Sequence, residues 1–149
     1  MDETVANPPD VKTLSPLELH YFRVPRERWE LMLTRARQMG ADAVSTSVPW
    51  LWHEPYDNAF DLTGITHPAR DVTDFLETCH VMGLAVILRI SPYLGAGLLG
   101  GGLPGWLIRE HPEIRAMGPD SRPRLDPASG DINGPLADHI GNIIKSQSV

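Results

Sequence analysis

The fold is decided by an apolar run over residues 84–90, which reads Leu84-Ala85-Val86-Ile87-Leu88-Arg89-Ile90. Runs of this kind are typical of parallel strands that are buried on both faces. The run follows Gly83, and glycine commonly lies just beyond the end of a helix. We therefore predict a buried parallel strand here, with a helix before it.

Two further strand patterns and two helical patterns precede this run. Alternating apolar residues predict a strand over 17–21, and residues 43–48 predict a second one. Apolar residues at three- and four-residue spacing predict helices over 25–40 and 71–82. The order strand, helix, strand, helix, strand predicts an α/β fold with parallel crossovers. In such folds the functional loops follow the carboxyl ends of the strands.

The remaining segments have weaker patterns. Residues 1–16 contain three prolines and are predicted to be a leader, so that residues 17–149 form the organised domain. We expect a long connection over 49–66, a short helix over 106–110, an irregular stretch over 112–134 and a last helix over 135–145.

Composition limits the partners and cofactors of the chain. The 149 residues carry a formal net charge of −6, which repels polyanions, so no nucleic-acid partner is expected. Cys79 is the only cysteine, and the six histidines lack metal-site spacings such as H-E-x-x-H, so we expect neither a metal nor another cofactor. The amino terminus has no signal-peptide pattern, and no apolar run approaches the roughly 20 residues of a membrane span. These features predict a soluble, cytoplasmic protein.

Residues 95–100 match the pattern G-x-G-x-x-G, which raises a nucleotide-binding hypothesis. The glycines of that fingerprint open a helix whose amino terminus faces a pyrophosphate. Here Gly101, Gly102 and Pro104 follow at once and oppose helix formation. Nucleotide binding therefore stays a third hypothesis, which a lack of binding to NAD or ATP would remove.

The segment after the second predicted strand collects chemically informative side chains. Residues 49–55 read Pro49-Trp50-Leu51-Trp52-His53-Glu54-Pro55. Aromatic faces can pack on sugar C–H surfaces while polar groups bind hydroxyls. Alternatively, the tryptophans fill the end of the fold and Glu54 anchors a loop, which is the interpretation that we favour for Glu54. Glycoside cleavage needs a converging carboxyl pair, and the positions of Glu18, Glu54 and Glu110 do not predict one.

Four segments, in order along the chain, resemble glycoside hydrolase family 35, which includes β-galactosidases. They are Glu18 to Pro25, Val48 to Pro55, Phe60 to Gly64, and Gly101 to Leu107. The resemblance implies that residues 17–149 are the N-terminal portion, about three βα units, of a (β/α)8 barrel that is incomplete without strands four to eight. Three strands would leave an unpaired sheet edge, so we expect poor stability as a monomer.

The resemblance also implies an activity, namely retaining hydrolysis of O-glycosyl bonds in β-galactosides or related carbohydrates. Its two catalytic glutamates belong to the fourth and seventh strands, beyond residue 149, so no catalytic residue is assigned and this chain alone is expected to be inactive. The implied substrate-binding positions are Ser47, Trp50, Glu54, Ala96 and Gly97.

The chain departs from the family pattern at several of these positions. Ser47 stands in place of a tyrosine, Gly97 in place of an acidic residue, and Leu51 in place of an asparagine. Loss of such hydrogen-bonding groups can cost orders of magnitude in selectivity. The alternative function is therefore that of a non-catalytic carbohydrate-binding or vestigial protein.

Overall fold

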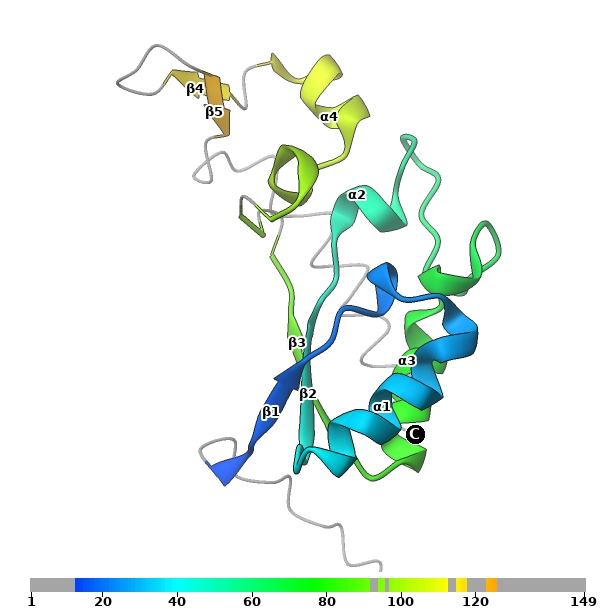
Figure 1. Ribbon diagram of the computed structural model, residues 1–149. Helices are drawn as coiled ribbons and strands as arrows, with labels where there is room; N and C mark the ends of the chain where they lie inside the picture. The colour runs from blue at the N-terminus through cyan, green and yellow to red at the C-terminus, as the bar shows by residue number, and fades with distance from the viewer. Residues whose placement is uncertain (1–12, 92–93, 96, 113–114, 118–122, 126–149) are drawn as a thin grey trace, which may run out of the picture.

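A three-stranded parallel sheet lies at the centre of the computed structural model, which describes residues 13–91, 94–95, 97–112, 115–117 and 123–125. The strand order is β1-β2-β3, with β1 at Pro16–Glu18, β2 at Ala43–Ser47 and β3 at Ala85–Arg89. Helices α1 (Trp29–Gln38) and α3 (Val72–Val81) connect successive strands and lie on the same side of the sheet (Figure 1). The predicted α/β class with parallel crossovers is confirmed.

Short elements gather beyond the carboxyl ends of the strands, where α2 and α4 lie at the opposite end of the molecule from the start of β1 (Figure 1). The helices there are α2 (Trp50–His53) and α4 (Gly105–Glu110), and the 3-10 turns are η2 (Tyr21–Arg23), η3 (Arg26–Arg28), η4 (Pro68–Arg70) and η5 (Leu99–Gly102). The connection predicted over 49–66 therefore contains a helical turn, and the helix predicted over 106–110 is present.

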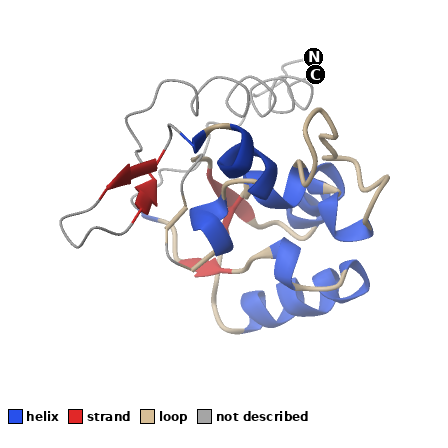
Figure 2. Ribbon diagram, turned by 90° about the horizontal axis from the view of Figure 1, so that it is seen from above, coloured by secondary structure: helices blue, strands red, loops and turns tan. Residues whose placement is uncertain are grey.

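An antiparallel hairpin occupies part of the stretch that was predicted to be irregular. Its strands are β4 (Arg115–Met117) and β5 (Pro123–Leu125), and they stand apart from the parallel sheet when the molecule is seen from above (Figure 2). The prediction of an irregular 112–134 was therefore wrong for these six residues. The helix predicted over 135–145 lies outside the described residues, as does most of the leader.

The core lies between the sheet and the two long helices. Trp29 and Leu33 of α1 and Phe75 and Cys79 of α3 are at most 1% exposed. The rings of Trp29 and Phe75 meet edge to face with centroids 5.2 Å apart. Full burial of a large apolar side chain stabilises a fold by roughly 1.5–3 kcal/mol, so this layer carries much of the driving force for folding.

Two sequence patterns extend further than the elements that they predicted. Pairing of β1 ends at Glu18, after which the chain enters η2, so Tyr21 is buried by packing rather than by lying in a strand. Helix α1 ends at Gln38, and Met39, counted in its apolar face, is 75% exposed. Strand β1 ends where its pairing with β2 ends, whereas α1 ends before Gly40, whose φ of 92° is left-handed.

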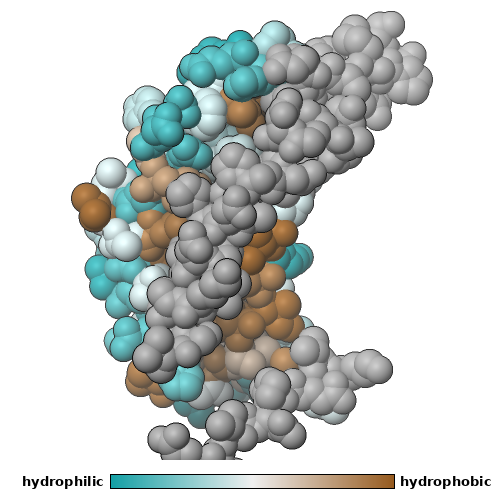
Figure 3. Space-filling view, turned by 180° about the vertical axis from the view of Figure 1, so that it is seen from behind, coloured by the Kyte–Doolittle hydropathy of each residue, from teal (hydrophilic) through white to brown (hydrophobic). Residues whose placement is uncertain are grey.

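The sheet face opposite the helices is less buried than the sequence indicated. Residues 85–88 of β3 are half-buried and Arg89 is exposed, although the apolar run predicted burial on both faces. Seen from behind, apolar side chains gather on the concave side of the molecule (Figure 3). Among the described residues β1 and β3 are edge strands, which is the situation in which we expected poor stability as a monomer.

The core predicts a protected thiol at Cys79. Burial raises the pKa of this thiol to about 12, and the thiolate is the reactive form. We expect Ellman's reagent at pH 8 to label Cys79 about a hundredfold or more slowly in native buffer than in urea. Equal rates in the two solutions would show that this chain does not hold its helix layer on the sheet.

Candidate functional site

Side chains from all three parallel strands meet at the carboxyl edge of the sheet. Register pairs Glu18 of β1 with Ser45 of β2, and Ser47 of β2 with Arg89 of β3. Because side chains alternate along a strand, these four residues share one face, opposite the face on which Val44 packs into the core. Loops that follow the three strands border the same edge. This edge is the candidate functional site.

The family-motif residues Trp50 and Glu54 hold the loop after β2. Trp50 is 1% exposed and Glu54 is 8% exposed. The Glu54 carboxylate accepts hydrogen bonds from the Trp50 indole and, at 3.0 Å, from the backbone amide of Asn58. The backbone carbonyl of Glu54 accepts a third hydrogen bond, from the Trp106 indole at 2.9 Å. This geometry assigns Glu54 to anchoring the loop, while sugar binding by Trp50 and Glu54 stays a prediction.

His53 links the loops that follow β1 and β2. Its Nδ1 lies 2.7 Å from the carbonyl oxygen of Asp61, so it carries a proton and donates. Its Nε2 lies 2.7 Å from the hydroxyl of Tyr21 and accepts from it. Burial lowers the pKa of His53 to about 4, against the opposing effect of the Asp61 carbonyl. The imidazole is therefore a neutral internal bridge.

Asp61 explains the motif Phe60 to Gly64. Its carboxylate accepts hydrogen bonds from the backbone amides of Thr63, Ile65 and Thr66 at 2.7–3.2 Å. Burial raises the pKa of Asp61, but these hydrogen bonds, those of Thr66 above all, hold it well below its usual range. Asp61 therefore shapes a turn, which is a common structural use of aspartate.

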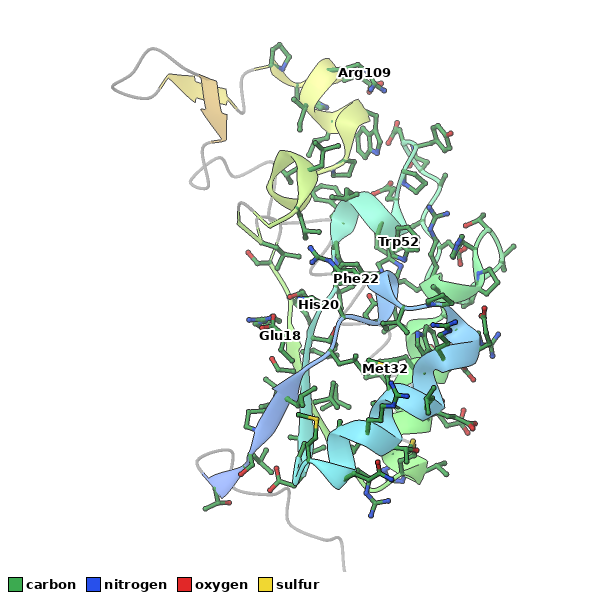
Figure 4. All side chains as sticks on the ribbon, in the orientation of Figure 1. Glu18, His20, Phe22, Met32, Trp52 and Arg109 are labelled. Carbon is green, nitrogen blue, oxygen red and sulfur yellow. The ribbon has the colours of Figure 1, made fainter. Side chains whose placement is uncertain are left out.

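Glu18 was weighed from the sequence only as a catalytic partner, and its pairing with Arg89 at this edge was not predicted. Its Oε1 forms an ion pair with Arg89 and lies 3.0 Å from Nε2 of His20. Glu18 and His20 lie across the sheet from Met32 of α1 (Figure 4). Arg89 lies near the carboxyl end of the strand predicted over 84–90, whereas Glu18 lies near the beginning of the one predicted over 17–21, so only Arg89 carried a positional signal. Their pairing across an intervening strand depends on tertiary structure.

The remaining predicted positions lie around the same edge. Ser47 is 6% exposed at the end of β2. Gly97 is exposed, and its carbonyl oxygen accepts a hydrogen bond from Arg23 at 2.8 Å, which ties the loop after β3 to η2. Ala96 lies outside the described residues. The structure thus places Ser47 at the end of β2 and Gly97 in the loop after β3, and their role in sugar binding stays a prediction.

The glycine motif does not open a helix in the described residues. Gly100 and Gly101 have φ values of 60° and 69°, so the chain makes a left-handed turn where the nucleotide fingerprint needs the first turn of a helix. Helix α4 begins only at Gly105. The geometry therefore gives no support to the nucleotide-binding hypothesis.

Neither a metal cluster nor a membrane span is found in the part of the chain that the structure describes. No three His, Cys, Asp or Glu side chains there are grouped so that they could hold a metal ion. Within the same residues, no helix has the length and apolar character that a membrane span needs.

Comparison with known proteins adds a family and relatives. Residues 10–124 match the family described as glycosyl hydrolases family 35. An exo-β-D-glucosaminidase of Pyrococcus horikoshii is 49% identical over 102 residues, which are 68% of this chain and 13% of that protein. A β-galactosidase of Mus musculus is 40% identical over 103 residues, which are 68% of this chain and 15% of that protein. The chain thus matches only a small part of the length of these relatives.

A solved structure is similar in fold. The crystal structure of a β-galactosidase from the psychrophilic Marinomonas ef1 superposes with a TM-score of 0.55 at 22% identity. The likeness covers 73% of this chain and 14% of that chain. At this identity it concerns the fold alone, and it agrees with the parallel α/β arrangement described above.

The anchoring role of Glu54 predicts a loss of stability in Glu54→Gln. The Glu54 carboxylate uses one oxygen for the Trp50 indole and the other for the Asn58 amide. A glutamine amide has only one oxygen, and its NH₂ group cannot accept the second hydrogen bond. We expect the free energy of unfolding to fall by about 1 to 3 kcal/mol, measured by urea denaturation. Glu110→Gln, at an exposed position of α4, is the control and should unfold as the unmodified chain does.

The His53 bridge predicts a loss of stability at acid pH. The pKa of His53 is about 4 in the folded chain and 6.5 ordinarily. Between these pH values the His53 imidazole is protonated in the unfolded chain and neutral in the folded chain, so protons favour unfolding. Stability should be complete above pH 6.5 and should fall by up to about 3 kcal/mol as the pH approaches 4. His53→Gln keeps hydrogen-bonding groups without titrating and should flatten the profile of melting temperature against pH. A profile as steep as that of the exposed-site control His80→Gln would contradict the assignment.

Proposed function

We propose, because this chain belongs to glycosyl hydrolases family 35, that it forms the first part of the catalytic domain of a β-glycosidase. The observation that carries the proposal is the family match over residues 10–124, together with polar residues at the carboxyl edge of a parallel sheet. Active sites of barrel enzymes lie at this edge. The reaction is hydrolysis of a terminal O-glycosidic bond in a β-galactoside or a related carbohydrate.

The proposed fold is the first three βα units of a (β/α)8 barrel. Three parallel strands in sequential order, with helices on one side of the sheet, support this proposal. The fold likeness to the Marinomonas ef1 enzyme supports it as well. Five more strands would then pair with the free edges of β1 and β3, close the barrel and cover the half-buried inner face.

In the proposed enzyme the two catalytic glutamates come from strands four and seven, as the family resemblance implies. Of the three glutamates weighed as partners, Glu54 has protein donors on both carboxylate oxygens and Glu18 is paired with Arg89. Neither is arranged as a general acid or nucleophile. The residues of this chain would instead shape one side of the substrate pocket.

Two kinds of sugar are candidate substrates of the proposed enzyme. One relative is named an exo-β-D-glucosaminidase and another a β-galactosidase, so an amino sugar and a neutral hexose are both substrates to test. Ser47 and Gly97 carry smaller side chains than the family pattern has at their positions, which favours a specificity that differs from that of a typical family member.

Carbohydrate binding without catalysis is the second candidate function. The departures at Ser47, Leu51 and Gly97 favour it, because each removes a hydrogen-bonding group from the implied sugar site. Binding alone would be supported if galactose or lactose raised the melting temperature of a protein that hydrolyses no glycoside.

The test begins with the coding sequence downstream of the Val149 codon. We expect it to encode a fourth strand ending in an Asn-Glu-Tyr type motif, and the extended protein to hydrolyse p-nitrophenyl β-D-galactoside. Glutamine in place of the motif glutamate should lower kcat by about a factor of 10² to 10⁴. The 149-residue chain itself should show no turnover. An extended protein that binds sugar but never hydrolyses it would favour the second candidate.

A further inference from the structure

Glu18 and Arg89 form a charged pair at the carboxyl edge of the sheet, on the face opposite the helices. We propose that this pair contacts the sugar: the Glu18 carboxylate accepts a hydrogen bond from one hydroxyl of a neutral pyranoside, and Arg89 donates to the oxygen of the neighbouring hydroxyl. This inference rests on the proposed function and specifies its substrate class.

The pair spans the strand that lies between its members. Glu18 is at the end of β1, Arg89 at the end of β3, and β2 runs between them. On this face β2 presents Ser45 and Ser47, two of the smallest side chains. Small residues leave room for long side chains to meet above β2. The pair therefore bridges the three strands at the edge where a barrel would hold its substrate.

The carboxylate of Glu18 is held in place but retains capacity to accept. Arg89 and His20 both contact Oε1, whereas Oε2 has no hydrogen bond from the described residues. The side chain of Glu18 is 56% exposed and that of Arg89 is 49% exposed. A guanidinium has five N–H donors, and only Nη2 of Arg89 is engaged with Glu18. The pair thus offers one acceptor and several donors to a ligand.

Neighbouring rings restrict how this acceptor can move. His20 stacks on Phe22 with centroids 5.0 Å apart. Figure 4 shows Glu18, His20 and Phe22 following one another from the end of β1 towards the loops. Nε2 of the stacked imidazole and Nη2 of Arg89 both contact Oε1, so two side chains hold the carboxylate through this oxygen. Such preorganisation reduces the entropic cost of binding.

Local charge favours a neutral sugar over a protonated amino sugar. Burial lowers the pKa of His20, and the positive charges of Arg23 and Arg89 lower it further against the opposing effect of Glu18. The imidazole is therefore neutral at pH 7. The charges that act on His20 are then the negative charge of Glu18 and the positive charges of Arg89 and Arg23. A sugar ammonium group would meet a net positive environment.

The ion pair between Glu18 and Arg89 is expected to contribute little to the stability of the fold. Exposed ion pairs contribute about 0–1 kcal/mol to folding, so removing one charge should leave the fold intact. Glu18→Gln and Arg89→Gln therefore change recognition without unfolding the chain. Slow reaction of Cys79 with Ellman's reagent is the check that each variant is folded.

The experiment is ligand-observed saturation-transfer NMR on the 149-residue chain. The probes are methyl β-D-galactopyranoside and methyl 2-amino-2-deoxy-β-D-glucopyranoside at pH 7. We expect saturation transfer to the neutral galactoside, with a Kd at least about tenfold higher in Glu18→Gln and in Arg89→Gln. Glu77→Gln, an exposed glutamate of α3, is the matched control and should bind as the unmodified chain does.

Several outcomes would overturn the assignment. An unchanged Kd in both folded variants would show that the pair does not contact the sugar, and a preference for the amino sugar would refute the substrate class. Absence of transfer to either probe would also overturn it. None of these results tests the proposed hydrolase function. That function is contradicted only if the extended protein does not hydrolyse glycosides. If Cys79 reacts rapidly in Glu18→Gln, that variant is not folded, and the Kd of Arg89→Gln alone tests the proposed contact.

Discussion

Parallel pairing of β2 with both of its neighbours is the constraint on which the rest of this structure depends. The register aligns Glu18, Ser45 and Ile87 in one row across the sheet. Because the three strands run in the same direction, the loops that follow them meet at a single edge. Side-chain alternation then separates the face that packs on the helices from the face that carries Glu18, Ser47 and Arg89. A shift of one residue in any strand would exchange these two faces.

The buried polar residues of the loops serve this arrangement. Glu54, His53 and Asp61 each bond to backbone groups or to the ring of another loop residue. Unpaired polar groups in such positions would be costly, so their partners determine the course of the loops. The motif residues that stand out most in the sequence thus act largely as scaffolding. In the proposed site, contact with the sugar is assigned to side chains at the strand ends that remain partly exposed.

The family relationship and the structure answer different questions. Membership in glycosyl hydrolases family 35 identifies the class of chemistry, whereas this chain matches 13% of the length of the Pyrococcus horikoshii relative. In the proposed enzyme the catalytic carboxylates come from strands that are not among these three, as the family resemblance implies. The proposed contribution of these residues is one wall of the site, in which the Glu18 carboxylate and the Arg89 guanidinium form an ion pair over β2.

Local patterns in the sequence determined the elements and their order. The apolar run at 84–90 and the helical spacing of Trp29, Leu33 and Ala36 predicted a strand and a helix that the structure contains, because periodic burial is a property of neighbouring residues. Tertiary structure decided where strand pairing ends, as at Glu18 of β1, and which polar residues come together. Glu18 and Arg89 are 71 residues apart in the chain. Their pairing depends on strand order and register, which local sequence periodicity does not encode.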